Sequence, residues 1–366
     1  MKAALIILSV FHGLIHLMGF VKAFELAEIK ALTLPISKPF GILWLSTFLL
    51  FIVASYLFFH KNNHWWIVGS IAIFISQLLV FYFWADAKFG TIANLIILFA
   101  IVIDYSSWNF ENDYKIDVAK AMSHLGNIQT EIISENDLTH LPNPVQKYLR
   151  YVGVVGQPKI KNVKISFTGE MREKGKEYFP FKSEQYNFFE KPTRLFFMQA
   201  KVKGLPANGY HTYKNDRADM SVRLLSLIPV ATMEAQVGEE GFNTETVTFF
   251  NDMCLFAPAA LIDKSIKWEE IDEHSARALF SNKGVTISTI LYFNPKGQLI
   301  NFISDDRCAI TPDGLKNYRF STPASNYKNI NGYNLCMYGE AIWHYPDEEF
   351  VYGKFSVADI AYNIKD

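Results

Sequence analysis

Charge is scarce in the first quarter of this sequence. Only ten of the 71 Lys, Arg, Asp and Glu residues precede Ser106, and the other 61 fall in the remaining 261 positions. The later density is close to the quarter expected of an ordinary soluble domain. The net charge of −1 is therefore the sum over a charge-poor N-terminal part and a normally charged remainder. It excludes the large positive charge that is typical of nucleic-acid-binding proteins.

Cysteines and catalytic motifs are also few. Three cysteines without close spacing, Cys254, Cys308 and Cys336, argue neither for nor against a disulfide framework. The sequence has no P-loop, dinucleotide fingerprint, nucleophile elbow, HExxH or CxxC motif. We therefore predict no cofactor, no metal site and no catalytic residue, and we favour a protein that is not an enzyme, without excluding one.

Four runs without a charged residue occupy the apolar part, at 3–21, 40–59, 65–84 and 89–103. About 20 apolar residues cross the hydrocarbon core of a bilayer, and only the fourth run is slightly short of that length. We predict a transmembrane domain of four helices over residues 1–105, in a multi-pass integral membrane protein. The lysines divide evenly between the two sides, so the positive-inside rule leaves the side of the later domain open.

Four polar residues interrupt these runs. His12 and His16 are one helical turn apart on the same face, and Gln77 and Asn94 in later runs can reach the same interior. We favour hydrogen bonding between packed helices as their role. Ionisable groups at this depth are also functional candidates, so a cofactor site or a proton path stays a second interpretation.

The pattern changes after residue 105. We predict a helical connector over 106–140, with a helix near 113–125, and then a β-rich soluble domain over 141–366. Asn143 and Pro144 mark the start of a short helix, and a second helix is expected from Asn243 to about Ala257. From Val163 onward apolar and polar residues alternate, which is typical of half-buried antiparallel strands. We expect strands at 163–171, 179–188, 194–202, 210–214, 276–280, 286–293, 299–309, 333–343 and 351–362. The expected fold is a membrane bundle plus an α+β domain, whose curved antiparallel sheet or incomplete barrel packs on one or two helices.

Aromatic residues are abundant in the β-rich part. They either fill the core between sheet and helix or line an apolar cleft for a small molecule. On the second interpretation we select a set of ligand-binding candidates from the strands and the second helix: Phe181, Gln185, Phe197, Tyr210, Phe250, Asp252 and Trp343.

The β-rich part contains a series of different short motifs. In chain order they are Leu141-Pro142-x-Pro144-Val145 with Tyr148-Leu149-Arg150, Phe181 with Gln185, Pro192 with Arg194, Gly204-Leu205-Pro206, Phe256-Ala257-Pro258-Ala259-Ala260-Leu261, Trp268 and Arg307. On these motifs, about 225 residues from Leu141 to the C-terminus resemble an uncharacterised bacterial family known as a domain of unknown function. The resemblance implies that the predicted membrane helices lie in the bacterial cytoplasmic membrane. Similar proteins are expected to carry Glu where this chain has Asp252. The strand pattern is similar to that of the lipoprotein carriers, in which an incomplete barrel wraps over a helix.

Three functions are compatible with these observations. The first is a membrane-anchored protein that binds a lipid or another apolar molecule in the cleft of its curved sheet. The second is an enzyme that uses a helix-borne carboxylate such as Asp252 on a lipidic or small substrate. The third places a cofactor or proton site at His12 and His16. We favour the first, with the bilayer and an apolar small molecule as partners and the oligomeric state open.

Overall fold

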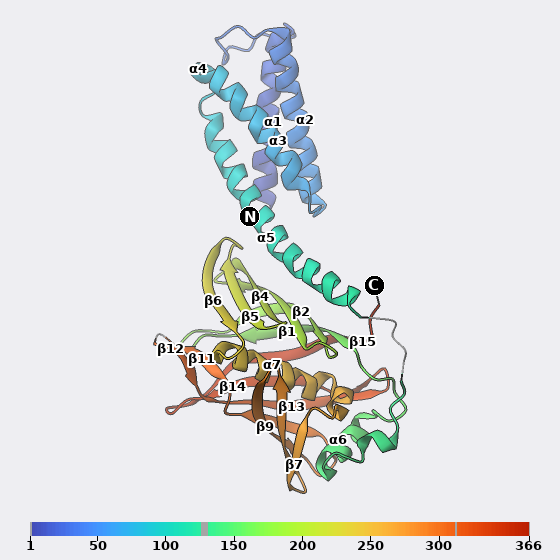
Figure 1. The fold of residues 1–366 in the computed structure, drawn as a ribbon. Helices are drawn as coiled ribbons and strands as arrows, with labels where there is room; N and C mark the ends of the chain where they lie inside the picture. Colours follow the sequence, from blue (N-terminus) through green and yellow to red (C-terminus); the bar gives the residue numbers. More distant parts are fainter. Residues whose placement is uncertain (1, 126–130, 312, 366) are drawn as a thin grey trace. The chain divides into compact units, whose positions relative to one another are not determined.

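The computed structural model describes residues 2–125, 131–311 and 313–365 (Figure 1). The chain divides into two compact units, Met1–Asn109 and Phe110–Asp366. The boundary falls inside a helix that continues through both units, because the helix α5 runs from Gly90 to Ser123.

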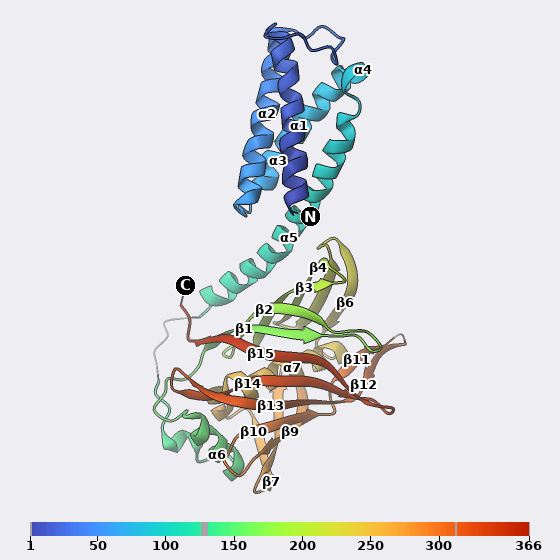
Figure 2. The ribbon, with the colours of Figure 1, turned by 180° about the vertical axis from the view of Figure 1, so that it is seen from behind.

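The first unit is a helical bundle. It contains α1 (Lys2–Ala23), α2 (Lys38–Phe59), α3 (Trp65–Tyr82), the short α4 (Trp84–Ala87) and the first part of α5. Four of these helices, all except α4, are long and apolar enough to cross a membrane. Figures 1 and 2 show α1, α2 and α3 side by side.

The end of the fourth apolar run differs from our expectation. We expected this run to stop near residue 103 and a separate helix to follow at 113–125, but α5 is continuous over 34 residues. The sequence between Ile103 and Ser123 contains neither proline nor glycine, so nothing in it interrupts the helix.

The second unit is built on a 13-stranded antiparallel sheet in the order β6-β5-β4-β3-β2-β1-β15-β14-β13-β10-β9-β8-β7. Its strands are β1 (Asn162–Met171), β2 (Phe179–Phe188), β3 (Thr193–Val202), β4 (Leu205–Lys214), β5 (Arg217–Leu224), β6 (Ile228–Gln236), β7 (Lys267–Asp272), β8 (Ser275–Asn282), β9 (Val285–Phe293), β10 (Leu299–Ser304), β13 (Arg319–Ile330), β14 (Tyr333–His344) and β15 (Glu349–Tyr362). The strands β6 and β7 form its two open edges, and β11 (Cys308–Thr311) pairs separately with β12 (Gly314–Asn317).

The helix α7 (Glu240–Phe256) is the centre of this unit. Figures 1 and 2 show the sheet curving around it, and 14 of its 17 residues are buried. The core around α7 includes the fully buried rings of Phe242, Phe249 and Phe250. The predicted fold class, a helical bundle plus an α+β domain with a curved, unclosed antiparallel sheet, is confirmed.

Several element boundaries differ from the sequence-based expectation. The helix α7 begins three residues before Asn243, and Pro142 rather than Asn143 precedes α6 (Asn143–Val152) as its N-cap. A single strand was expected over 299–309, but β10 and β11 separate where Asp305 and Asp306 interrupt the pairing. Short 3₁₀ helices at Glu135–Leu138 and Pro258–Ile262 complete the described structure.

Candidate functional site

A buried ion pair joins α7 to the sheet. The Nε of Arg194, on β3, donates to Oδ2 of Asp252 at 2.7 Å. The same carboxylate oxygen accepts from Nε2 of Gln185 at 2.7 Å and from Nδ2 of Asn187 at 3.3 Å. All four side chains are buried, so these contacts satisfy polar groups that would otherwise be costly to remove from water.

Further titratable groups surround this pair. The carboxylate of Glu245, about two helical turns from Asp252 on α7, lies 3.8 Å from Nη1 of Arg194. Burial lowers the pKa of His211 to about 3, and the cationic side chains of Arg194 and Arg307 add to this shift. His211 is therefore neutral at physiological pH, which avoids a third cation in the interior.

The guanidinium of Arg307 lies among three aromatic rings. Its central carbon is 4.0 Å from the ring centroid of Phe320, 5.0 Å from that of Trp343 and 6.0 Å from that of Tyr352. Its Nη1 also donates to the hydroxyl of Tyr352 at 2.9 Å. The candidate Trp343 thus contributes to a cation–π arrangement inside the domain.

Two other candidates lie in the packed core. The ring of Phe250 stacks on Phe280 with centroids 4.9 Å apart, and Phe181 meets Phe355 edge to face at 5.2 Å. Both side chains are at most 4% exposed. In this position they contribute packing energy between helix and sheet.

The remaining two candidates, Phe197 and Tyr210, lie on the opposite face of the sheet. Successive side chains of a strand point to opposite faces, so Phe196 faces α7 while Phe197 faces away from it. There the ring of Tyr114, on α5, stacks on Phe197 at 5.4 Å and meets Tyr210 edge to face at 5.7 Å. The hydroxyls of Tyr114 and Tyr210 donate to Glu184 and Asp117, respectively.

A groove of about 400 Å³ lies beside these rings on that outer face. Three of its lining residues come from α5 and the others from β1, β2, β3 and β15: Glu111, Tyr114, Lys115, Ser166, Phe167, Thr168, Lys182, Ser183, Glu184, Phe197, Gln199 and Ala358. The sequence pattern did not predict this groove, because the helix and the strands that form its walls are more than 40 residues apart in the chain. The amphipathic pattern of the helix that carries Tyr114 was the only signal of it.

Charges are distributed unevenly around this groove. Lys115 pairs with Glu111 at 2.6 Å, and Glu184 pairs with Lys164 at 2.7 Å. Lys182 is exposed and forms no ion pair with the described residues. The groove therefore combines an aromatic wall with one cation that is available to an anionic group.

The four polar residues expected inside the bundle form one network. The amide oxygen of Asn94 accepts from Nε2 of His12 at 2.9 Å and from the hydroxyl of Ser76 at 3.0 Å. Its amide nitrogen donates to Gln77 at 3.0 Å. Nδ1 of His16 bonds to the backbone oxygen of His12 at 2.9 Å. The network links α1, α3 and α5 through groups that are buried or half-buried.

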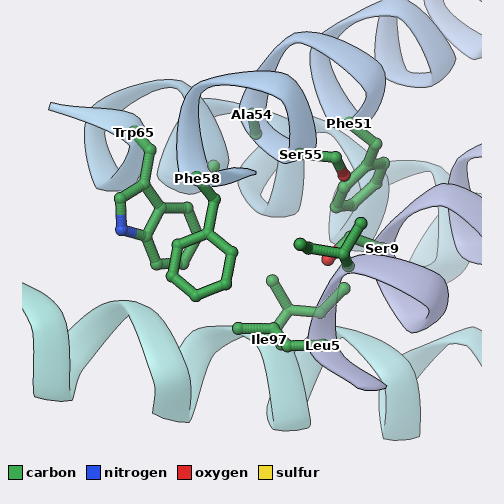
Figure 3. Close-up of a pocket in the computed structure, with 10 residues that line it drawn as sticks. Leu5, Ser9, Phe51, Ala54, Ser55, Phe58, Trp65 and Ile97 are labelled. Atoms are coloured by element: carbon green, nitrogen blue, oxygen red, sulfur yellow. The ribbon is translucent and has the colours of Figure 1, made fainter. Parts of the chain in front are cut away.

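A small cavity lies near this network (Figure 3). Its volume is about 10 Å³, which is at the lower limit for a single water molecule. Figure 3 shows the rings of Phe58 and Trp65 close together at one end of it, with Ser9 and Ser55 at the other. A void of this size holds no ligand. In the part of the chain that the structure describes, no group of three or more His, Cys, Asp or Glu residues is placed to hold a metal ion.

Replacing Asn94 by Leu is expected to lower the free energy of unfolding of the bundle by about 1–2 kcal/mol, the contribution that hydrogen bonds between helices make in a membrane. The change removes three side-chain bonds at once. Denaturation of the full chain in detergent measures the loss. Leu95→Ala is the matched control, since the neighbouring Leu95 is 59% exposed, makes no contribution to the network and stays apolar in this variant. Equal stability of Asn94→Leu and the unmodified protein would contradict a packing role for the network.

The fold and its outer groove together define a class: an open antiparallel sheet wrapped around one helix, in a chain with four apolar helices. A model of a family of unknown function, DUF6544, matches residues 131–355, and the chain belongs to this family. The resemblance seen in the sequence motifs is thereby confirmed.

Two further comparisons add little to this assignment. No curated protein matches the chain. Among solved structures, a LolA superfamily protein from Nitrosomonas europaea is similar to it, with 9% sequence identity and a TM-score of 0.35. That match covers 61% of this chain and 94% of the other.

Proposed function

We propose that this protein is anchored in the bacterial cytoplasmic membrane by its four apolar helices and holds one amphiphilic molecule, of the lipid class, in the outer groove. The observation that carries the proposal is the groove of about 400 Å³ between α5 and strands β1 to β3. Small-molecule sites occupy about 300–1,000 Å³ and combine apolar walls with a few placed polar groups.

The lining of the groove matches both ends of such a molecule. Tyr114 and Phe197 are 2% and 5% exposed, so their stacked rings form the apolar floor at the bottom of the groove. The ammonium of Lys182 and the polar side chains of Thr168 and Gln199 stand at the exposed side. An anionic headgroup would pair with Lys182 while the apolar part lies along the rings.

The side chains of the bundle support the membrane location. Phe11, Phe74 and Phe99 are 62%, 66% and 59% exposed on the surfaces of their helices. His12 and Asn94 are instead buried at 3% and 2%. Apolar groups outside and polar groups inside are the arrangement that a lipid solvent favours.

The alternative sites have less support. The described donors to Asp252 are Gln185, Asn187 and Arg194, which lie on β2 and β3. They attach α7 to the sheet, so this carboxylate has a structural role rather than a catalytic one. In the bundle, His12 is hydrogen-bonded to the amide oxygen of Asn94. Among the described residues, no third ligand joins His12 and His16 to form a metal site. We therefore place the ligand in the groove rather than beside α7 or inside the bundle.

Replacing Gln199 by Trp tests the ligand site. Gln199 is exposed in the groove, so the larger ring occupies the space without disturbing the core. Native mass spectrometry of the full chain, released from lipid nanodiscs, should show a bound lipid on the unmodified protein. We expect the bound fraction to fall roughly tenfold in Gln199→Trp, the effect of losing about 1.4 kcal/mol of binding free energy.

The charge of Lys182 allows a second test of the proposed lipid site. Lys182→Glu should lower the bound fraction of anionic lipid more than that of zwitterionic lipid, because it replaces the attraction to the headgroup by repulsion. Lys191→Glu is the matched control, since Lys191 is exposed between β2 and β3 and does not line the groove. Absence of bound lipid in the unmodified protein, or equal effects of both charge reversals, would refute the proposal.

A further inference from the structure

Two neighbouring turns form one end of the sheet, and we call this surface the apolar tip. It consists of residues 201–206, the turn between β3 and β4 with the adjoining strand ends, and residues 223–230, the turn between β5 and β6 with the adjoining strand ends. The backbone nitrogen of Leu225 donates to the oxygen of Pro206 at 2.7 Å, and Nδ2 of Asn208 donates to the hydroxyl of Ser226 at 2.9 Å. These bonds hold the two turns together as one surface.

The apolar tip presents large side chains to solvent. Leu205 and Leu227 are 38% and 37% exposed, and Ile228 and Val230 are 55% and 57% exposed. Clustered apolar side chains on the surface of a domain usually mark a contact with a partner or a membrane. Isolated exposed apolar residues need no such explanation, but these four belong to two turns that are bonded to each other.

The backbone of the apolar tip is strained at the turn between β5 and β6. Leu225 and Ser226 have φ values of 55° and 57°, so both central residues of the β5–β6 turn are left-handed. Asn and Gly favour that conformation, whereas a leucine there is strained. The strained turn carries Leu227 and Ile228 at the surface, and such strain is typical of functional segments.

The charge of the tip has one sign. Its two segments contain Lys201, Lys203 and Arg223 and no Asp or Glu. At the opposite edge of the sheet, the exposed Ile271 of β7 stands among acidic residues, Glu269, Glu270 and Asp272. The exposed apolar residue at the β7 edge is therefore surrounded by acidic groups, whereas those of the tip are flanked by cationic ones.

We propose that the apolar tip docks on the surface of an anionic lipid bilayer, as a second membrane contact besides the four apolar helices. Apolar side chains flanked by Lys and Arg insert between headgroups while the cations pair with anionic lipids. The same chain carries helices able to span the membrane, so a bilayer is available at high effective concentration. The proposal rests on the proposed membrane location and is independent of a ligand in the groove.

The test uses the full chain in nanodiscs that hold one copy each. A polarity-sensitive fluorophore is attached at Ile228→Cys in one sample and at Ile271→Cys in the other; the native cysteines are buried. In nanodiscs of phosphatidylcholine and phosphatidylglycerol we expect quenching of the Ile228→Cys label by aqueous iodide to fall roughly threefold relative to the Ile271→Cys label, since the inserted label is shielded from water.

Charge reversal in the labelled protein completes the test. Lys201→Glu with Lys203→Glu should restore iodide quenching at the Ile228→Cys label, because the cations no longer attract the surface. Lys283→Glu is the control, since Lys283 lies in the β8–β9 turn, outside the tip. Equal quenching at both labels in anionic nanodiscs would overturn the proposal. Shielding that persists in detergent, or appears only when two copies share a nanodisc, would also overturn it. Lipid detection by mass spectrometry reports on the groove separately.

Discussion

Replacing Asp252 by Ala is expected to lower the free energy of unfolding by about 3–5 kcal/mol, because the change leaves the guanidinium of Arg194 buried without its closest counter-charge. Arg194 is only 7% exposed, so water cannot replace the lost carboxylate. Two amide donors, from Gln185 and Asn187, lose their acceptor in the same step. Chemical denaturation of the full chain in detergent, followed by near-ultraviolet circular dichroism, measures this effect.

Asp305→Ala is the matched control for that experiment. Asp305 accepts two bonds from Arg319 at 2.9 and 3.1 Å, but both side chains are more than half exposed. Exposed ion pairs contribute about 0–1 kcal/mol, so this variant should unfold nearly as the unmodified protein does.

A triple variant separates the buried charges from a simple loss of packing. Arg194→Met with Asp252→Leu and Glu245→Gln removes all three charges, including the buried carboxylate of Glu245 that lies 3.8 Å from Nη1 of Arg194. Replacing a buried ion pair or triad by groups of similar volume is often neutral or stabilising, so we expect this variant to be more stable than Asp252→Ala alone. A triple variant as unstable as the single one would show that burial of an unpaired charge is not the cause.

Replacing Gly169 by Ala is expected to cost about 3 kcal/mol, at the upper end of what overpacking usually causes. A Cβ atom at this position would lie 2.1 Å from the backbone oxygen of Lys354 and 2.7 Å from the ring of Phe181. The backbone oxygen belongs to β15, which pairs with β1 and joins the N-terminal and C-terminal strands of the sheet. The clash can be relieved only by separating these strands.

Gly209→Ala is the control for Gly169→Ala. Gly209 also lies inside a strand, but the nearest atom to its Cβ would be Cε of Met198 at 3.4 Å, an ordinary contact. The free energy of unfolding of Gly209→Ala should differ from that of the unmodified protein by less than about 1 kcal/mol in either direction. Equal destabilisation by the two alanines would indicate that loss of glycine, rather than the contact with Lys354, is responsible.

Local patterns in the sequence predicted much of the architecture. The alternation over 179–188 coincides with β2, since a half-buried strand imposes a period of two on its own residues. Strand β13 was not expected, and its sequence carries Pro323 and two asparagines, Asn326 and Asn329, which are unfavourable in strands. The pairing of β13 with β10 and β14 outweighs these preferences.

The positions of the candidate residues depended on contacts that are distant in sequence. Gln185 and Asp252 were both selected from the sequence, but nothing in the pattern indicated that Arg194 would join them. Phe197 and Tyr210 were expected to share a cleft with Phe250. They face away from α7 instead, because the register of β3 and β4 places them on the outer side.

The sequence by itself determined the division of this protein into an apolar quarter and a strand-rich remainder, and it identified the family. Hydropathy and strand periodicity are properties of neighbouring residues, so no contact between distant segments is needed to see them. Only the tertiary structure decided which polar groups meet. The bond between His12 and Asn94 spans 82 residues, and the ion pair between Arg194 and Asp252 spans 58. The outer groove exists only because the end of α5 packs against strands that follow it by more than 40 residues.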